Sequence, residues 1–262
     1  MRKIAIMTSK GGTGKTTTAI NLGHCLALSG KRVLLLDCDS QANISMAFES
    51  SPERGLAELL TTGEVDIAKV RPNLFIIDSG GKRLVESELL LARQEDRETR
   101  LSKVLQRLVG SDYVICDCPP TINLININAL NFCDQVIIPV SMDFFACEGV
   151  RKTLALIEEI RDRIGHDLEV AGLLATFFDK RTRISQRTYD QLLGEYGDLV
   201  FATRIRINTQ LKEAQAKFQT IFEFAPYSHG ALDYFLLTKE IANGSCGAPT
   251  EVRTDGSYKD LA

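Results

Sequence analysis

Near its start the chain runs from an apolar segment into a glycine-rich loop and then into a helical pattern. Residues 3–7 (KIAIM) predict a short strand, residues 9–17 read SKGGTGKTT, and residues 16–29 have the apolar spacing of a helix that Gly30 ends. Strand, glycine loop and helix in this order form the context in which a loop binds phosphate. The sequence therefore predicts an α/β fold whose first connection is a nucleotide-binding loop.

Further apolar runs of strand length alternate with stretches of helical spacing. Strands are expected at 32–37, 73–78, 112–117, 135–140 and 170–175, and helices at 56–61, 86–109 with a break near 95–96, 149–164, 185–196 and 229–241. A continuous apolar run such as RVLLLD at 32–37 is typical of a strand buried on both faces. This alternation favours βαβ units, so we expect an α/β fold with a mostly parallel twisted sheet flanked by helices on both faces, of the P-loop NTPase type.

Length and composition fit one large domain. The 262 residues carry a net charge of −3, and 44% of them are hydrophobic, which is enough for a substantial core. No secretory signal and no apolar run of about 18 residues occurs, so a cytoplasmic protein is expected. Residues 1–242 are expected to form the domain, and residues 243–262, rich in Gly, Ser and Pro, a flexible tail.

Cysteine and histidine usage does not indicate a metal centre. The seven cysteines include no C-x-x-C pair, so buried reduced thiols are expected. The three histidines are far apart in sequence and have no partner at ligand spacing. Metal chemistry, if present, is expected to depend on carboxylates and hydroxyls.

The loop contains the groups that phosphate binding needs. Its glycines let backbone N–H groups converge on phosphate oxygens, Lys15 supplies positive charge, and Thr16 offers a hydroxyl to Mg²⁺. The regular pattern G-x-x-x-x-G-K-[ST] would place its first glycine at position 9, where this chain has Ser9, and a second lysine, Lys10, follows. The predicted nucleotide contacts from the loop are Lys10, Gly11, Gly12, Thr13, Gly14, Lys15, Thr16 and Thr17.

The form K-G-G-x-G-K-T-T at residues 10–17 resembles the deviant Walker A loop of the ParA/MinD family of ATPases. The resemblance implies that Lys10 lies at the face of a nucleotide-sandwich homodimer and reaches the phosphates bound in the other subunit. A lysine placed there neutralises the charge of two nucleotides packed face to face, much as an arginine finger does. We therefore expect both Lys10 and Lys15 to be catalytic, with ATP and Mg²⁺ as the ligands.

The block LLDCDSQAN, which ends the second expected strand, is similar to the family's D-x-D-P-Q-x-N segment, with Ser40 where proline is commoner. The resemblance implies that Asp39 orients the attacking water, because a carboxylate accepts a hydrogen bond from that water. Asp37 is expected to support the metal or the loop.

A third carboxylate ends the apolar run 112–117. Apolar residues followed by Asp117 at a strand end form a Walker B pattern, which predicts that Asp117 holds Mg²⁺. Ligands of open parallel sheets bind beyond the carboxyl ends of the strands, so the loop and the aspartates should meet there. The predicted metal site consists of Thr16, Asp39 and Asp117.

The resemblance also covers segments in which the family places purine-ring contacts. Asp179 and Asn208 are the corresponding residues and are expected to contact the base. Two departures weaken the match, since position 206 is Arg where proline is usual, and residues 217–221 lack the glycine commonly found there.

Basic residues gather in the C-terminal half. Between residues 180 and 217 there are eight Lys or Arg and four Asp or Glu, a local excess of four positive charges. ParA-like ATPases bind DNA without sequence preference when ATP makes them dimerise, and phosphate contacts of that kind need positive charge at the right spacing. The candidate DNA-binding residues are Arg181, Arg183, Arg187, Arg204, Arg206 and Lys217.

The resemblance thus implies a Mg²⁺-dependent partition or positioning ATPase. ATP would drive dimerisation and binding to nonspecific DNA, and a ParB-like or cargo-adaptor partner would stimulate hydrolysis and release. The start of the chain at its first strand is typical of the short Soj-like members, and the ATP-bound form is expected on the nucleoid. The cargo, whether chromosome, plasmid or protein assembly, stays open.

Three alternatives remain open. A membrane-associated MinD-type ATPase would need an amphipathic tail, and residues 243–262 offer only Val252 and Leu261 as apolar anchors. A metabolic ATP-dependent ligase of the same fold has no use for a second lysine acting in trans, so Lys10 argues against it. An iron–sulfur carrier of related fold would need a cluster bridged between subunits, since paired cysteines are lacking.

Overall fold

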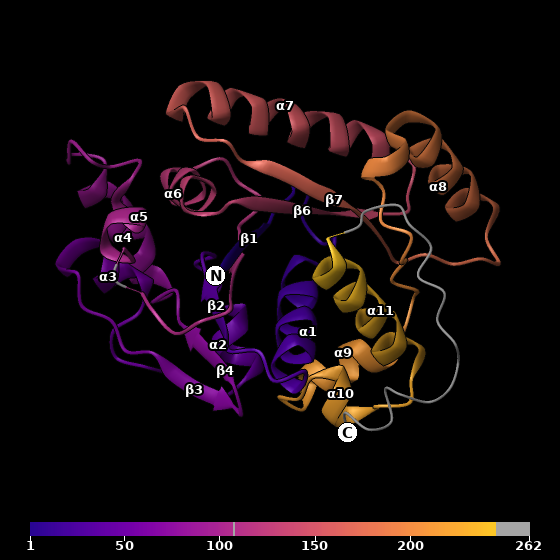
Figure 1. The fold of residues 1–262 in the computed structure, drawn as a ribbon, viewed down its shortest axis with the longest axis horizontal. Helices are drawn as coiled ribbons and strands as arrows, with labels where there is room; N and C mark the ends of the chain where they lie inside the picture. The colour runs from indigo at the N-terminus through magenta and orange to yellow at the C-terminus, as the bar shows by residue number, and fades with distance from the viewer. Residues whose placement is uncertain (107, 245–262) are drawn as a thin grey trace.

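A seven-stranded sheet runs through the computed structural model, which describes residues 1–106 and 108–244 (Figure 1). The strands are β1 (Arg2–Ile6), β2 (Val33–Asp37), β3 (Ala68–Arg71), β4 (Leu74–Ile77), β5 (Tyr113–Asp117), β6 (Gln135–Ser141) and β7 (Glu169–Thr176). They lie in the order β3-β4-β2-β5-β1-β6-β7. Neighbours pair in parallel, apart from the antiparallel edge pair β3–β4, so the predicted fold class is confirmed.

Helices cover both faces of this sheet. They are α1 (Lys15–Leu28), α2 (Asn43–Ala47), α3 (Leu56–Thr62), α4 (Lys82–Leu91), α5 (Arg100–Val104), α6 (Leu124–Phe132), α7 (Ala146–Ile164), α8 (Arg183–Tyr196), α9 (Thr209–Ala216), α10 (Ile221–Phe224) and α11 (His229–Asn243), with a short 3₁₀ turn at Gly197–Leu199. Figure 1 shows α1 and α11 on one face of the sheet and α6 and α7 on the other. Because β1, β2, β5 and β7 run parallel, the segments that follow these strands emerge at one edge of the sheet.

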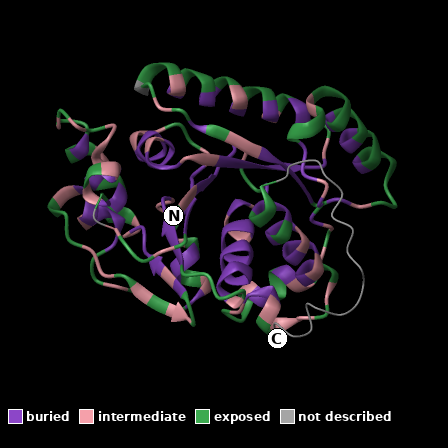
Figure 2. Ribbon diagram, in the orientation of Figure 1, coloured by how far each residue is buried: buried purple, intermediate pink, exposed green. Residues whose placement is uncertain are grey.

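Alternate residues of each central strand enter two separate cores. In β2, Leu34 and Leu36 pack with the α3–α7 side, whereas Val33 and Leu35 pack with α1 and α11. Successive side chains of a strand point to opposite faces, so a strand covered on both sides must be apolar throughout. Figure 2 shows the result, with buried central strands and an exposed outer side on α7 and α8.

Helix α6 was not predicted from the sequence. Its residues LININALNF are almost all buried, so it lacks the polar face by which a surface helix is recognised. Its asparagines bond to backbone instead: Asn126 donates to Pro119 O at 3.0 Å, and Asn128 donates to Leu124 O at 2.9 Å and accepts from Leu101 N at 3.0 Å. The Asn126 bond holds the loop that follows Asp117 at the end of β5, and the Asn128 bond to Leu101 ties α6 to α5.

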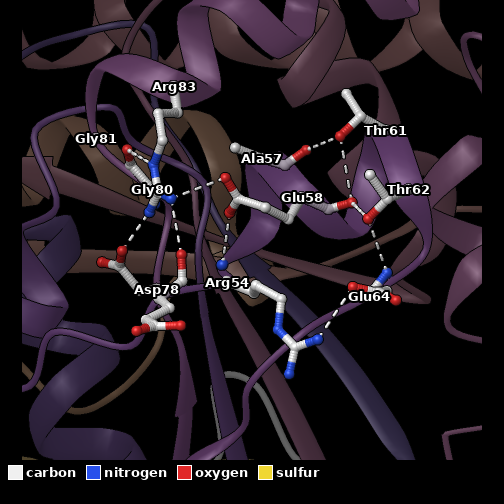
Figure 3. Close-up of polar contacts among 12 residues, drawn as sticks. Arg54, Ala57, Glu58, Thr61, Thr62, Glu64, Asp78, Gly80, Gly81 and Arg83 are labelled. Atoms are coloured by element: carbon white, nitrogen blue, oxygen red, sulfur yellow. Dashed lines mark hydrogen bonds and ion pairs between the residues drawn. The ribbon is translucent and has the colours of Figure 1, made fainter.

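The segment after β2 is fastened by the start of α3. Glu58 accepts a hydrogen bond from Gly55 N at 2.8 Å and pairs with Arg83 at 3.0 Å (Figure 3). A Cβ at Gly55 would lie 2.4 Å from Asp78 O, so this close approach to the end of β4 requires glycine. The start of α3 is thereby held against the carboxyl end of β4.

The six cysteines within the described residues are free thiols and buried, as expected, while Cys246 lies outside them. The flexible tail was assigned to residues 243–262; α11 extends to Asn243, and residues 245–262 are outside the described part. No helix in the described ranges is long and apolar enough to span a bilayer.

Candidate nucleotide-binding site

A cavity of about 630 Å³ opens at the carboxyl ends of the strands. It is lined by the loop residues Gly11, Gly12, Thr13, Gly14, Lys15, Thr16 and Thr17, and by Asp39, Asn43, Met46, Ala47, Pro120, Phe177, Gln215, Ala216 and Phe218. Segments that follow β1, β2, β5 and β7 therefore meet around one space, at the edge where open α/β sheets bind their ligands.

The phosphate loop is held in an open form by its neighbours. Gly12 and Gly14 have φ values of +71° and +88°, a conformation that side chains disfavour, and Gly14 immediately precedes α1. Thr176 at the end of β7 donates to Thr13 O at 2.9 Å. Ser9, where the regular pattern has glycine, bonds to Thr153 of α7 through its backbone N at 3.1 Å and its hydroxyl at 3.2 Å. Ser9 thus fastens the loop to α7.

Lys15 is buried at the base of the loop, with its Nζ 3.4 Å from Lys10 O. Burial lowers the pKa of Lys15, and the nearby carboxylates of Asp117 and Asp39 act in the opposite direction. An ammonium group held between a phosphate loop and two carboxylates can neutralise the phosphates of a bound nucleotide.

Asp37 and Asp39 have different environments. Asp37 is fully buried and accepts from Asp39 N at 3.0 Å and from Ile44 N at 3.0 Å, so it shapes the loop after β2. Burial raises the pKa of Asp37, as does the neighbouring carboxylate of Asp117. Asp39 lines the cavity, where one of its oxygens accepts from Gln41 N at 3.0 Å. Asp37 therefore supports the loop, and Asp39 faces the space a nucleotide would fill.

Asp117 is buried, and neither of its carboxylate oxygens has a hydrogen-bond partner among the described residues. Burial raises the pKa of Asp117 to about 7, while the Thr16 hydroxyl and the Lys15 ammonium oppose this effect. A buried carboxylate without partners is costly unless a cation joins it, so this feature fits Mg²⁺.

Within the described part of the chain, no group of three or more His, Cys, Asp or Glu side chains could hold a metal ion by itself. Mg²⁺ commonly binds through one or two protein oxygens together with water and substrate phosphates. Thr16 and Asp117 would supply the protein oxygens, and Asp39 lies on the same cavity.

Lys10 is directed away from the loop's own cavity. Its Nζ lies 2.5 Å from Asp143 Oδ2 and 3.3 Å from Ser141 Oγ, and Ser141 itself donates to Asp143 at 2.6 Å. Ser141 is the last residue of β6, and Asp143 lies in the segment between β6 and α7. The side chain of Lys10 is 35% exposed, whereas Lys15 is buried, so the two lysines occupy separate environments.

The two residues expected to contact the base are not among those that line the cavity. Asp179 pairs with Arg181 at 2.9 Å, which lowers the pKa of Asp179 to about 2, and Asn208 accepts from Gln210 N at the start of α9. Their assignment remains a prediction. The cavity wall in this region consists of Phe177, Gln215, Ala216 and Phe218.

The sequence did not predict several residues that line the cavity or contact the loop. Phe218 had one signal, because it stands in the segment where the family commonly has glycine. Asp143, Ser141 and Thr153 had none, since their contacts with the loop arise from residues distant in sequence.

The basic residues proposed for DNA differ in their contacts. Arg181 pairs with Asp179, and Arg206 pairs with the buried Asp233 at 2.5 Å. Arg204 lies over the rings of Phe178 and Tyr189 and lines, with Arg206, a second cavity of about 610 Å³; Lys217 lies over the ring of Phe224.

The remaining two, Arg183 and Arg187, are exposed on α8, and neither has an acidic partner among the described residues. Arg183 and Arg187 are therefore available to bind an external anion, whereas Arg181 and Arg206 are already paired with aspartates.

Comparison with known proteins adds to this geometry. The AAA domain family AAA_31 matches residues 1–170. The chromosome-partitioning ATPase Soj of Thermus thermophilus is 39% identical, with 92% of this chain and 95% of that protein covered. The sporulation initiation inhibitor protein Soj of Bacillus subtilis is 36% identical, with 91% and 97% covered. Cobyrinic acid a,c-diamide synthase from Mycobacterium smegmatis, solved with ADP and magnesium, superposes with a TM-score of 0.79 at 27% identity, over 93% of this chain and 94% of that one.

Proposed function

The chain belongs to the ParA/Soj family of partition ATPases, and on that premise we propose that it is a Mg²⁺-dependent ATPase that partitions or positions DNA or another cargo. The observation that carries the proposal is that Lys15 and Asp39 line one cavity and that the buried, unpartnered carboxylate of Asp117 lies close enough to act on the charge of Lys15. A metabolic ligase would share the phosphate loop, but its reaction would not require a second lysine such as Lys10 that acts on the other subunit.

Each group has a role in hydrolysis that its position supports. The loop N–H groups and Lys15 bind and neutralise the phosphates. Thr16 and Asp117 offer oxygens to Mg²⁺, which when bound offsets the charge that develops on the phosphoryl oxygens. Asp39 accepts a hydrogen bond from the attacking water and orients it toward the γ-phosphorus.

The position of Lys10 supports the proposal that the protein also forms an ATP-dependent homodimer. Its ammonium is partly exposed beside α7, where it is bonded to Asp143 and Ser141. In a face-to-face dimer this lysine would reach the phosphates held by the other subunit. Two nucleotides brought together in this way need added positive charge, as in other phosphoryl-transfer sites completed in trans.

DNA is the proposed binding partner of the dimer, and a ParB-like or cargo-adaptor protein the proposed stimulator. Arg183 and Arg187 on α8 supply exposed positive charge without an acidic partner among the described residues. Duplicating this surface in a dimer would strengthen binding to DNA by effective concentration. Hydrolysis would then return the protein to a monomer of low DNA affinity.

The experiment is a paired measurement of hydrolysis and DNA binding. The purified chain should hydrolyse ATP only with Mg²⁺, and it should retard nonspecific duplex DNA in gel shifts with ATP but not with ADP. Nucleotide-independent DNA binding would contradict the proposed cycle. An absence of Mg²⁺-dependent hydrolysis in the presence of DNA and partner would contradict the activity itself.

A further inference from the structure

Two phenylalanines that line the nucleotide cavity have a backbone conformation that normally favours glycine. Phe177 has φ +53° and Phe218 has φ +56°. The other non-glycine residues with positive φ in the described ranges are Ala42, Glu49 and Asn73. Left-handed backbone is strained for a bulky residue, and such strained residues cluster at functional sites. Two such aromatic residues on one cavity wall call for a common explanation.

Phe218 occupies the position just past helix α9 where a helix most often ends in glycine. Phe218 N donates to Gln215 O at 3.1 Å and Gln219 N donates to Ala214 O at 3.0 Å, which is the Schellman pattern. Glycine is preferred at the first of these positions because it adopts positive φ without strain. The chain instead places an aromatic ring there, and that ring lines the cavity.

The turn that carries Phe218 is held from both sides. Arg71 on the edge strand β3 donates to Phe218 O at 3.1 Å and pairs with Glu223. Gln215 donates to the hydroxyl of Thr17, in the first turn of α1 directly after the phosphate loop, at 3.0 Å. The backbone N–H groups and the Gln215 amide are thus engaged within the protein, so this part of the wall presents its aromatic ring to a ligand.

Phe177 brings its ring against the phosphate loop itself. It follows β7 directly, and a Cβ built at Gly14 would lie 3.8 Å from Phe177 Cε2. The preceding residue, Thr176, is bonded to Thr13 O, so the position of the ring is tied to the loop. Phe177 and Phe218 are 40% and 39% exposed, so part of each ring is open to the cavity that they line.

We propose that Phe177 and Phe218 hold the nucleobase of the bound nucleotide by contact with their ring faces. Base–aromatic stacking is worth about 1–3 kcal/mol per base when measured by removing the ring, which corresponds to a change in affinity of roughly 5- to 150-fold. This gain compensates for the backbone strain at the two positions. The inference rests on the proposed nucleotide binding and assigns its base-binding residues.

Replacing Phe218 with Gly tests the inference, because it removes the ring and relieves the strained backbone at once. The bond from Arg71 goes to the carbonyl of residue 218 and survives the change. We expect the F218G protein to bind ATP and GTP about tenfold more weakly than the parent protein in the presence of Mg²⁺. Binding of inorganic tripolyphosphate should stay within about twofold, and the melting temperature should not fall. F177G should behave in the same way toward the three ligands.

The matched control is Asn73→Gly, which relieves positive φ (+60°) in the turn between β3 and β4, away from the cavity lining. It should leave all three affinities unchanged. ATP binding by F218G and F177G at parental strength would overturn the inference and leave the proposed function standing. Equal weakening for tripolyphosphate would also overturn it, because the rings would then act on the loop. A parent protein that binds neither ATP nor tripolyphosphate would overturn the proposed function and the inference together.

Discussion

The ammonium of Lys10 lies 2.5 Å from the Oδ2 atom of Asp143, so the lysine proposed to act on the other subunit is paired within its own. Ser141 bonds to both partners and fixes the geometry of the pair. The backbone carbonyl of Asp143 also accepts from Thr188 of α8 at 3.5 Å. The lysine must leave this pair before it can reach a phosphate in trans, so we expect the pair to oppose the proposed dimerisation.

Removing the charge of Asp143 should therefore favour the ATP-bound dimer. A partly exposed ion pair of this kind contributes about 1 kcal/mol, so we expect Asp143→Asn to tighten dimerisation in Mg²⁺ and a nonhydrolysable ATP analogue by about fivefold. Sedimentation velocity over a range of protein concentrations measures this change. Glu148→Gln, which removes a carboxylate paired with Lys152 on the same helix, is the control and should leave dimerisation unchanged. A weaker dimer in Asp143→Asn would show that the pair supports the interface instead.

Asp117→Asn should abolish Mg²⁺-dependent turnover, with a loss of at least about 100-fold, because it removes the buried oxygen charge that Mg²⁺ needs. The same variant should be more stable than the parent protein without nucleotide, since a buried carboxylate without partners beside Asp37 destabilises the fold. ATPase assays and thermal melts with and without Mg²⁺ measure both effects. Asp37→Asn is the informative comparison and should lower the melting temperature, because Asp37 holds the loop through Asp39 N and Ile44 N. Normal turnover in Asp117→Asn would remove the residue from the metal site.

The sequence predicted the strands whose hydrophobic pattern directly reflects their burial. The strands at 32–37 and 112–117 were predicted because short, continuous apolar runs between turns are typical of strands buried on both faces of a sheet. Helix α6 was not predicted, since the side-chain amides of its buried asparagines reach their backbone acceptors only in the folded chain. The phosphate loop could be predicted from its local sequence pattern. The hydrogen bond between Ser9 and Thr153 could not, because the two residues are distant in sequence.

DNA binding should depend on Arg183 and Arg187, which are exposed and have no acidic partner in the described ranges. The double variant Arg183→Glu/Arg187→Glu should weaken ATP-dependent binding to nonspecific DNA. It should also reduce the salt dependence of binding, by about one in log–log slope for each phosphate that is no longer neutralised. Unchanged gel shifts in this variant would move the DNA surface elsewhere.

The control for the α8 variant is Lys31→Glu/Lys69→Glu, which makes the same change of charge at exposed positions away from α8. It should leave both the affinity for DNA and its salt dependence close to those of the parent protein. Arg206 is a poor test of DNA binding, because its removal would leave Asp233 buried and unpaired.

His24 should make the fold sensitive to acid. It is buried on α1 with Nδ1 2.6 Å from the Thr220 hydroxyl, and burial lowers the pKa of His24 to about 4. The unfolded chain binds this proton near pH 6.5, so the free energy of unfolding is unaffected above that pH and decreases as the pH falls toward 4, by up to about 3 kcal/mol. His24→Gln should therefore lose less stability than the parent protein between about pH 7 and pH 4.5 in urea titrations. Equal losses in the two proteins would contradict the assignment.

Lys15 is proposed to serve the chain's own nucleotide and Lys10 the nucleotide of the partner subunit, and this division of roles can be tested on a single variant. Sedimentation velocity of Lys10→Ala with Mg²⁺ and ATP measures its assembly, and ATP binding and turnover are measured on the same sample. We expect ATP affinity within about twofold of the parent protein, a monomer at all concentrations, and no detectable turnover. A dimer with normal turnover would contradict the proposed roles, and so would a loss of ATP binding by the monomer.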